Sequence, residues 1–96
     1  MTTWFVSRHP GALEWMRREG IAFDAHVPHL DVGCVAEGDV VIGTLPMPLA
    51  ADVQARGASY WHLELQVPAN KRGQELSADE LQALGSSLRP YRVERL

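Results

Sequence analysis

Two short, uninterrupted apolar runs restrict the fold of this chain more than any other feature of its sequence. The runs are Trp4–Val6 and Val40–Ile42, and both consist of residues that favour β-strands. Continuous apolar runs of this length are typical of strands covered on both faces, as in the centre of a parallel sheet. Each run is followed by a turn and then by a helix-like segment with a proline near its start. Such strand–turn–helix units predict an α/β fold.

Three segments show the apolar spacing of helices that pack against a core. We expect helices over 10–19 and 48–56, with Gly20 and Gly57 in the left-handed position that often follows a helix. The third helix begins at a capping box, Ser77–Glu80. The residues predicted to face the core are Ala12, Leu13, Trp15 and Met16 in the first helix, Leu49, Ala50 and Val53 in the second, and Leu81, Leu84 and Leu88 in the third.

The segment 60–67 has the alternation of a half-buried strand. Its apolar face consists of Trp61, Leu63, Leu65 and Val67, and its polar face of Tyr60, His62, Glu64 and Gln66. A strand with one polar face is expected near an edge of the sheet or against a partner subunit.

Segments 21–30 and 91–96 complete the expected strands, so the elements follow the order βαββαβαβ. This order predicts a small Rossmann-like three-layer sandwich of the α/β class with a mostly parallel sheet. We expect the 96 residues, 1–96, to form a single domain. The core of so small a domain is thin, and oligomerisation commonly supplements it.

The charge balance argues against a protein that holds long DNA or RNA. The chain has nine Lys and Arg against twelve Asp and Glu, a net charge of −3. Proteins that grip long nucleic acids by their phosphates usually carry a basic excess. An anion bound here is expected to be a small molecule in a locally basic pocket.

A single cysteine, Cys34, excludes an internal disulfide and a zinc site built from several cysteines. The first residues lack the basic region and the long apolar run of a signal peptide. No segment approaches the roughly 20 apolar residues that span a bilayer. The expected location is therefore the cytoplasm, without contact with a membrane.

Three loops follow predicted strands and could carry chemistry, because ligands of open α/β sheets bind beyond the carboxyl ends of the strands. They are Ser7–Gly11, Gly43–Pro46 and Pro68–Gly73. In the first, Arg8 suits phosphate oxygens and His9 suits acid–base chemistry near neutral pH. A purely structural alternative is that Arg8 pairs with a carboxylate while His9 caps the helix.

The other loops are open to two interpretations each. Gly43 and Thr44 fit a phosphate-contacting loop or an ordinary tight turn, and Lys71 with Arg72 fits a ligand contact or a solvated pair. No metal site and no cofactor are predicted. His26 and His29 are three residues apart, which on a strand places them on opposite faces. The glycine patterns of nucleotide triphosphate and dinucleotide sites are absent from the sequence.

Several blocks together resemble a small family of CRISPR accessory proteins from type III loci, the sixteenth of the Csx series. The blocks are Trp4–Ala12 with Glu14-Trp15, His29–Asp31, Gly38–Pro46, His62-Leu63 and Arg72–Ser77. They span nearly the whole chain, and the first and the Gly38–Pro46 block are the most specific. Arg8-His9 also resembles the Arg-His-Gly opening of histidine phosphatases, but Pro10 intervenes here and that family needs a larger domain.

The resemblance to the accessory family implies a ring nuclease. Such proteins degrade cyclic oligoadenylate, typically cyclic tetra-adenylate, and thereby switch off the effector nucleases of type III antiviral signalling. They work without metal: a ribose 2′-OH attacks its adjacent phosphate and leaves a 2′,3′-cyclic phosphate. An alternative from another class is a sensor or sponge that binds the same ligand without cleaving it, and a third is an adaptor that binds only protein.

The loops themselves suggest roles for residues in such a reaction. Arg8, with the first helix N-terminus, would hold the phosphate, and His9 would accept the 2′-OH proton. Thr44 would orient the sugar–phosphate backbone. The remaining residues expected to contact the ligand are Ser7, Gly11, Gly43, Leu45, Lys71 and Arg72. We expect a homodimer, because two facing copies of the Arg8 loop could grip opposite phosphates of a two-fold symmetric ring.

Overall fold

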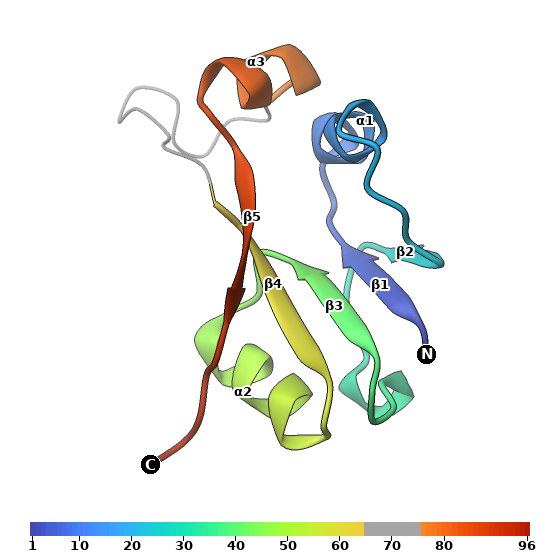
Figure 1. The fold of residues 1–96 in the computed structure, drawn as a ribbon, viewed down its shortest axis with the longest axis vertical. Coiled ribbons are helices and arrows are strands. Elements are labelled where there is room, and N and C mark those ends of the chain that lie inside the picture. Colours follow the sequence, from blue (N-terminus) through green and yellow to red (C-terminus); the bar gives the residue numbers. More distant parts are fainter. Residues whose placement is uncertain (65–75) are drawn as a thin grey trace.

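The computed structural model of the chain describes residues 1–64 and 76–96. Within them it contains five strands, three α-helices and one turn of 3₁₀-helix (Figure 1). In chain order the elements are β1 Thr3–Val6, α1 Pro10–Arg18, β2 Ala25–Val27, η1 Val32–Cys34, β3 Val40–Gly43, α2 Met47–Ala55, β4 Ser59–Glu64, α3 Ala78–Ala83 and β5 Ser87–Tyr91. None of the helices in the described ranges is long and apolar enough to cross a membrane.

The strands form one mixed sheet in the order β2-β1-β3-β4-β5. The first four strands in this order are parallel, and β5 joins β4 in the antiparallel sense. In Figure 1, α1 and α3 lie next to each other at one end of the molecule and α2 lies towards the other. The predicted α/β class and the βαββαβαβ order are confirmed.

The sheet separates two apolar clusters, which makes the fold three-layered. Alternate strand residues supply opposite clusters, because successive side chains of a strand point to opposite faces. The cluster under α1 and α3 contains Phe5, Ala12, Trp15, Met16, Ile42, Leu63, Ala78 and Leu81. The cluster under α2 and η1 contains Val6, Val35, Val41, Ala50, Val53, Ala58 and Tyr60. The two apolar runs of the sequence are therefore covered on both faces, as expected.

The cap residues predicted for the helices are confirmed by the backbone. Pro10 occupies the first turn of α1, and Gly20 and Gly57 adopt φ of +68° and +86° after α1 and α2. At the start of α3, Ser77 Oγ accepts a hydrogen bond from Glu80 N–H, and the Glu80 carboxylate accepts one from Ser77 N–H. These local signals fix where the helices begin and end because they satisfy backbone groups that the helix leaves open.

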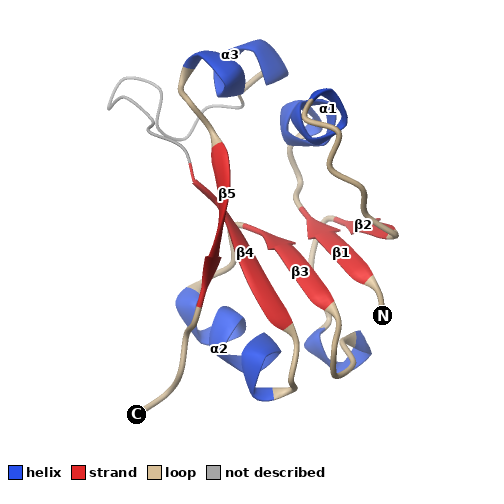
Figure 2. Ribbon diagram, viewed as in Figure 1, coloured by secondary structure: helices blue, strands red, loops and turns tan. Residues whose placement is uncertain are grey.

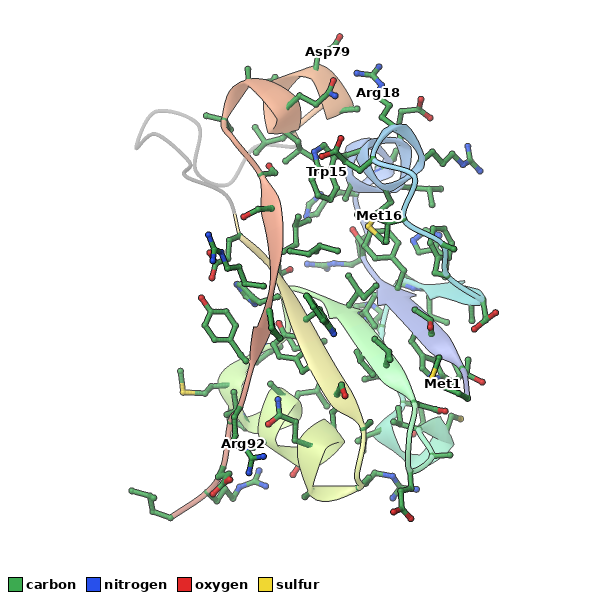
Figure 3. The ribbon with its side chains drawn as sticks, in the orientation of Figure 1. Met1, Trp15, Met16, Arg18, Asp79 and Arg92 are labelled. Carbon is green, nitrogen blue, oxygen red and sulfur yellow. The ribbon has the colours of Figure 1, made fainter. Side chains whose placement is uncertain are left out.

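Helices α1 and α3 pack closely at a glycine. A Cβ at Gly11 would lie 2.0 Å from the carbonyl oxygen of Leu76, so only glycine allows this approach. On the outer side of the same contact, Arg18 donates hydrogen bonds to Asp79 and Gln82 (Figure 3). The buried Trp15 and Met16 lie on the inner side of α1.

The expectation for 60–67 was confirmed in position and wrong for one side chain. β4 spans Ser59–Glu64 and lies between β3 and the edge strand β5, and so near an edge of the sheet. Tyr60, assigned to a polar face, is only 3% exposed. Alternation misled the prediction because a tyrosine can bury its ring in the core and still satisfy its hydroxyl by hydrogen bonds. Residues 65–67 lie outside the described part of the chain.

The last strand also differs from the prediction. α3 ends at Ala83, so Leu88 belongs to β5 and not to the helix, and β5 covers Ser87–Tyr91 instead of 91–96. Pro90 is compatible with this position because β5 pairs on one side only, and an edge strand tolerates a residue without an N–H group. The second strand is shorter than the expected 21–30 and covers only Ala25–Val27.

A buried carboxylate fastens the amino ends of the central strands. Asp39 is 4% exposed and precedes β3. Its carboxylate accepts hydrogen bonds from Thr2 N–H at 2.9 Å, Ala36 N–H at 2.9 Å and Trp4 Nε1–H at 3.1 Å. The Ala36 and Thr2 amides, followed by the Trp4 indole, hold the pKa of Asp39 below its usual value, because all three stabilise the charged form.

Candidate functional site

The sheet reverses its direction of growth between β1 and β3. From β1 the chain moves outward to β2, then returns to place β3 on the other side of β1 (Figure 2). In open α/β sheets this switch point opens a crevice beyond the carboxyl ends of the two strands, where ligands bind. Val6 pairs with Gly43 in the register, so the loops that follow β1 and β3 start side by side.

A hollow of about 150 Å³ lies at this switch point, and we call it the switch-point hollow. It brings together four residues predicted for the site: Ser7, His9, Gly43 and Thr44. Its floor and walls are otherwise apolar, and the residues are Phe5, Val6, Ala12, Leu63, Leu76 and Leu81. A few polar groups above an apolar floor are typical of small-molecule sites.

Ser7 holds the loop after β1 by three hydrogen bonds. Its N–H donates to the carbonyl of Val27 at 3.0 Å, and its Oγ accepts from His9 N–H at 3.1 Å. Its carbonyl oxygen accepts a hydrogen bond from Nε2 of His26 at 3.0 Å. The His26 ring in turn stacks on Phe5, with the ring centroids 5.3 Å apart. The backbone that presents the next two side chains is thus fixed to the sheet.

Arg8 and His9 themselves are exposed, and with the described residues neither takes up its purely structural role. His9 is the N-cap residue of α1, but its side chain makes no capping hydrogen bond. Among residues 1–64 and 76–96, no carboxylate forms an ion pair with Arg8. Arg8 is also not among the residues that line the switch-point hollow.

The loop after β3 is organised by the hydroxyl of Tyr60. Tyr60 Oη accepts a hydrogen bond from Leu45 N–H at 2.9 Å and lies 3.1 Å from the carbonyl oxygen of Gly43. Burial raises the pKa of the Tyr60 hydroxyl, and the Leu45 hydrogen bond opposes this effect. Leu45 packs on the α2 side of the core, while the Thr44 side chain stays exposed beside the hollow.

Gly43 is a position where a side chain cannot fit. A Cβ there would lie 2.6 Å from the carbonyl oxygen of Val6 in the neighbouring strand. Gly43 therefore allows the backbones of β1 and β3 to meet closely at the edge where the hollow opens.

A family model covers residues 4–94 and is described as "Putative CRISPR-associated protein (Cas_VVA1548)". The chain belongs to this family. The CRISPR association implied by the sequence resemblance is thereby confirmed, while ring-nuclease activity stays a prediction. No curated protein and no solved structure matches the chain.

Two of the residues predicted to contact the ligand in this CRISPR-associated chain have structural roles instead. Gly11 allows α1 to approach the Leu76 backbone, and the Leu45 amide is already bonded to Tyr60. Lys71 and Arg72 lie outside the described residues. Within the described ranges, no group of three or more His, Cys, Asp or Glu side chains could hold a metal ion.

The predicted site did not include Tyr60, His62 or His26, although His62 and Glu64 were assigned to one face of their strand and open to a surface, interface or catalytic role. His62 pairs with Gly43 in the register, at the same edge of the sheet, and its Nδ1 lies 2.6 Å from Tyr60 Oη. One available signal was the i,i+2 spacing of Tyr60 and His62, which places both on one face of a strand. Nothing in the sequence links His26 with Ser7, because that contact depends on the pairing of β1 with β2.

Proposed function

We propose that this CRISPR-associated protein is a ring nuclease that cleaves cyclic oligoadenylate, in the first place cyclic tetra-adenylate, without a metal ion. The observation that carries the proposal is the switch-point hollow. There the loop with His9 meets the loop with Thr44. The family supplies the CRISPR context. The sequence resemblance supplies the reaction class.

The proposed reaction needs a phosphate held in place and one proton removed. Arg8 binds the non-bridging phosphate oxygens, on which negative charge grows in the transition state. His9 takes the proton from the ribose 2′-OH as this oxygen attacks phosphorus. The P–O5′ bond breaks, the departing O5′ atom takes up a proton, and the products carry a 2′,3′-cyclic phosphate and a 5′-OH. Thr44, beside the hollow, orients the sugar–phosphate backbone for in-line attack.

The same proposal includes a two-fold symmetric homodimer. The switch-point hollow measures about 150 Å³, less than the roughly 300–1,000 Å³ of pockets that enclose drug-sized ligands. This hollow therefore holds only part of a tetranucleotide ring, and a second copy facing it would hold the equivalent part across the two-fold axis. Light scattering with and without cyclic tetra-adenylate tests this. A monomer that persists with bound ligand contradicts the dimer.

The decisive experiment incubates the purified protein with labelled cyclic tetra-adenylate in excess EDTA and separates the products. We expect linear fragments with a 2′,3′-cyclic phosphate terminus, formed at the same rate without EDTA. Loss of cleavage in EDTA, restored by a divalent ion, contradicts the metal-free mechanism. A ring that is retained intact identifies a sensor or sponge, and absence of both binding and cleavage favours a protein-binding adaptor.

A further inference from the structure

A second, shallow hollow of about 630 Å³ borders the switch-point hollow and shares Thr44 and Leu63 with it. We call it the His62 hollow. Its lining consists of Thr44, His62, Leu63, Glu64, Gly85, Ser87, Arg89 and Tyr91. Since β3 lies between β1 and β4, Thr44 separates His9, which follows β1, from His62 near the end of β4.

His62 is held by a hydroxyl that is itself fixed. Tyr60 lies two residues earlier on β4, on the same face, and its oxygen has three neighbours: Leu45 N, Gly43 O and His62 Nδ1. A tyrosine hydroxyl has one proton to donate and lone pairs that accept. The Leu45 amide can only donate, and the Gly43 carbonyl can only accept.

These fixed roles determine which nitrogen of His62 carries the proton. If Tyr60 donates its proton to the Gly43 carbonyl, all three contacts are hydrogen bonds only when Nδ1–H of His62 donates to Tyr60. If Tyr60 donates to Nδ1 instead, the Gly43 carbonyl at 3.1 Å is left without a proton. A buried polar contact that lacks its proton is costly. The arrangement that satisfies all three contacts has the neutral imidazole protonated on Nδ1, and no described residue forms a hydrogen bond with its Nε2.

The same network tolerates a charged His62. The imidazolium also donates from Nδ1, so Tyr60 keeps all three hydrogen bonds when a proton is gained or lost at Nε2. Histidines that transfer protons in enzymes commonly have one ring nitrogen held by a hydrogen bond and the other facing the ligand.

We propose that His62 is a second catalytic residue, which donates a proton from Nε2 to the departing O5′ atom. The inference rests on the proposed ring-nuclease function. In an in-line displacement the attacking and leaving oxygens lie on opposite sides of phosphorus, so the base and the acid must flank the phosphate. With the phosphate over Thr44, His9 takes the 2′-OH proton from one side and His62 supplies the O5′ proton from the other. Tyr60 is the positioning residue.

Among the described residues, four charged or titratable groups lie around His62. On its own strand these are Tyr60 and Glu64, and on β5 they are Arg89, its register partner, and Tyr91. Arg89 forms an ion pair with Glu64 at 3.9 Å, and the Tyr91 ring meets the His62 ring edge-on at 5.8 Å. The carboxylate beside His62 is thus paired with a cation.

The test distinguishes a general acid from a general base by changing the leaving atom from oxygen to sulfur. Single-turnover cleavage is measured on cyclic tetra-adenylate and on a ring with one 5′-bridging sulfur, since a thiolate leaves without protonation. We expect His62→Gln to slow cleavage of the natural ring by about 10²–10⁴-fold and to recover most of this loss at the sulfur linkage. His9→Ala should be slow on both rings, and His29→Gln, at an exposed histidine outside both hollows, should match wild type.

Two measurements on wild-type protein keep the inference falsifiable even if His62→Gln fails to fold. The decline of the natural reaction at alkaline pH should vanish with the sulfur ring. Nitrogen-15 NMR should find the neutral His62 ring protonated on Nδ1, and Tyr60→Phe should shift this proton towards Nε2. A proton on Nε2 in the wild type, or an equal loss on both rings in His62→Gln, overturns the assignment. Wild type that cleaves neither ring overturns the proposed function, and this role with it.

Discussion

Polar side chains at the two ends of the parallel strands differ in burial and in hydrogen bonding. At the amino edge, Asp39 is buried and its carboxylate accepts three hydrogen bonds from the chain. At the carboxyl edge, Arg8 and His9 are exposed, and neither an ion pair within the described residues nor a helix-capping bond uses their side chains. The backbone between them is nevertheless fixed through Ser7.

The contrast separates side chains that hold the fold from side chains available to a ligand. A carboxylate whose hydrogen bonds are all made internally stabilises the native chain, and its loss should lower stability without touching the chemistry. A guanidinium and an imidazole presented on a rigid loop should show the reverse.

Replacing His9 with Ala should reduce the single-turnover cleavage rate by about 10²–10⁴-fold, because general-base catalysis contributes that much. Affinity for cyclic tetra-adenylate and the free energy of unfolding should hardly change, since the His9 side chain caps nothing. The rise of rate with pH should also flatten. His29→Ala is the matched control. A near-wild-type rate with an unchanged pH profile would leave His9 without a catalytic role.

Replacing Arg8 with Ala should weaken the binding of cyclic tetra-adenylate by about 10- to 150-fold, the equivalent of roughly 1.5–3 kcal/mol for a charge-assisted hydrogen bond. Cleavage should slow as well, because charge grows on the same oxygens. Titration calorimetry measures the first effect. Arg17→Ala, on the exposed side of α1, is the control. Equal affinities of the Arg8 and Arg17 variants would remove Arg8 from the site.

Replacing Gly43 with Ala tests the junction of the two loops. The added Cβ meets the Val6 carbonyl oxygen at 2.6 Å, and overpacking of this kind costs about 1–3 kcal/mol in the free energy of unfolding. Because the strands must move apart beside Thr44, cleavage should fall too. Urea denaturation gives the stability change. An unchanged midpoint would mean that this edge of the sheet yields without strain.

Asp39 should give the smallest effect, and its contribution should disappear in acid. Its pKa is lowered in the folded protein, so its contribution to stability is present above the pKa of the unfolded chain, about 3.9, and is lost as pH falls through the lower folded value. Urea denaturation of wild type and Asp39→Asn between pH 2 and pH 7 measures this. The variant should be less stable at pH 7 and should lose less on acidification. Parallel curves would contradict the role of the carboxylate.

Local sequence signals were sufficient for the order of the elements and for the main loops, but not for the bounds of β2, α3 and β5. The apolar runs of β1 and β3, the proline and glycine at the ends of the helices and the capping box of α3 all act within a few residues. Because the carboxyl ends of parallel strands share one edge, the same signals placed the candidate loops at that edge, and the structure shows that Ser7–Gly11 and Gly43–Pro46 start side by side there.

Only the tertiary structure decided which strands are neighbours and what each polar side chain contacts. β4 is internal because β5 pairs beside it, a choice that no alternation within β4 reveals. Tyr60 is buried in the core because its hydroxyl forms hydrogen bonds with the backbone of Leu45 and Gly43. The same hydroxyl contacts Nδ1 of His62 and orients its ring. The physical reason is that hydrogen-bond satisfaction of a buried group depends on partners distant in sequence, whereas strand, helix and turn preferences depend on near neighbours.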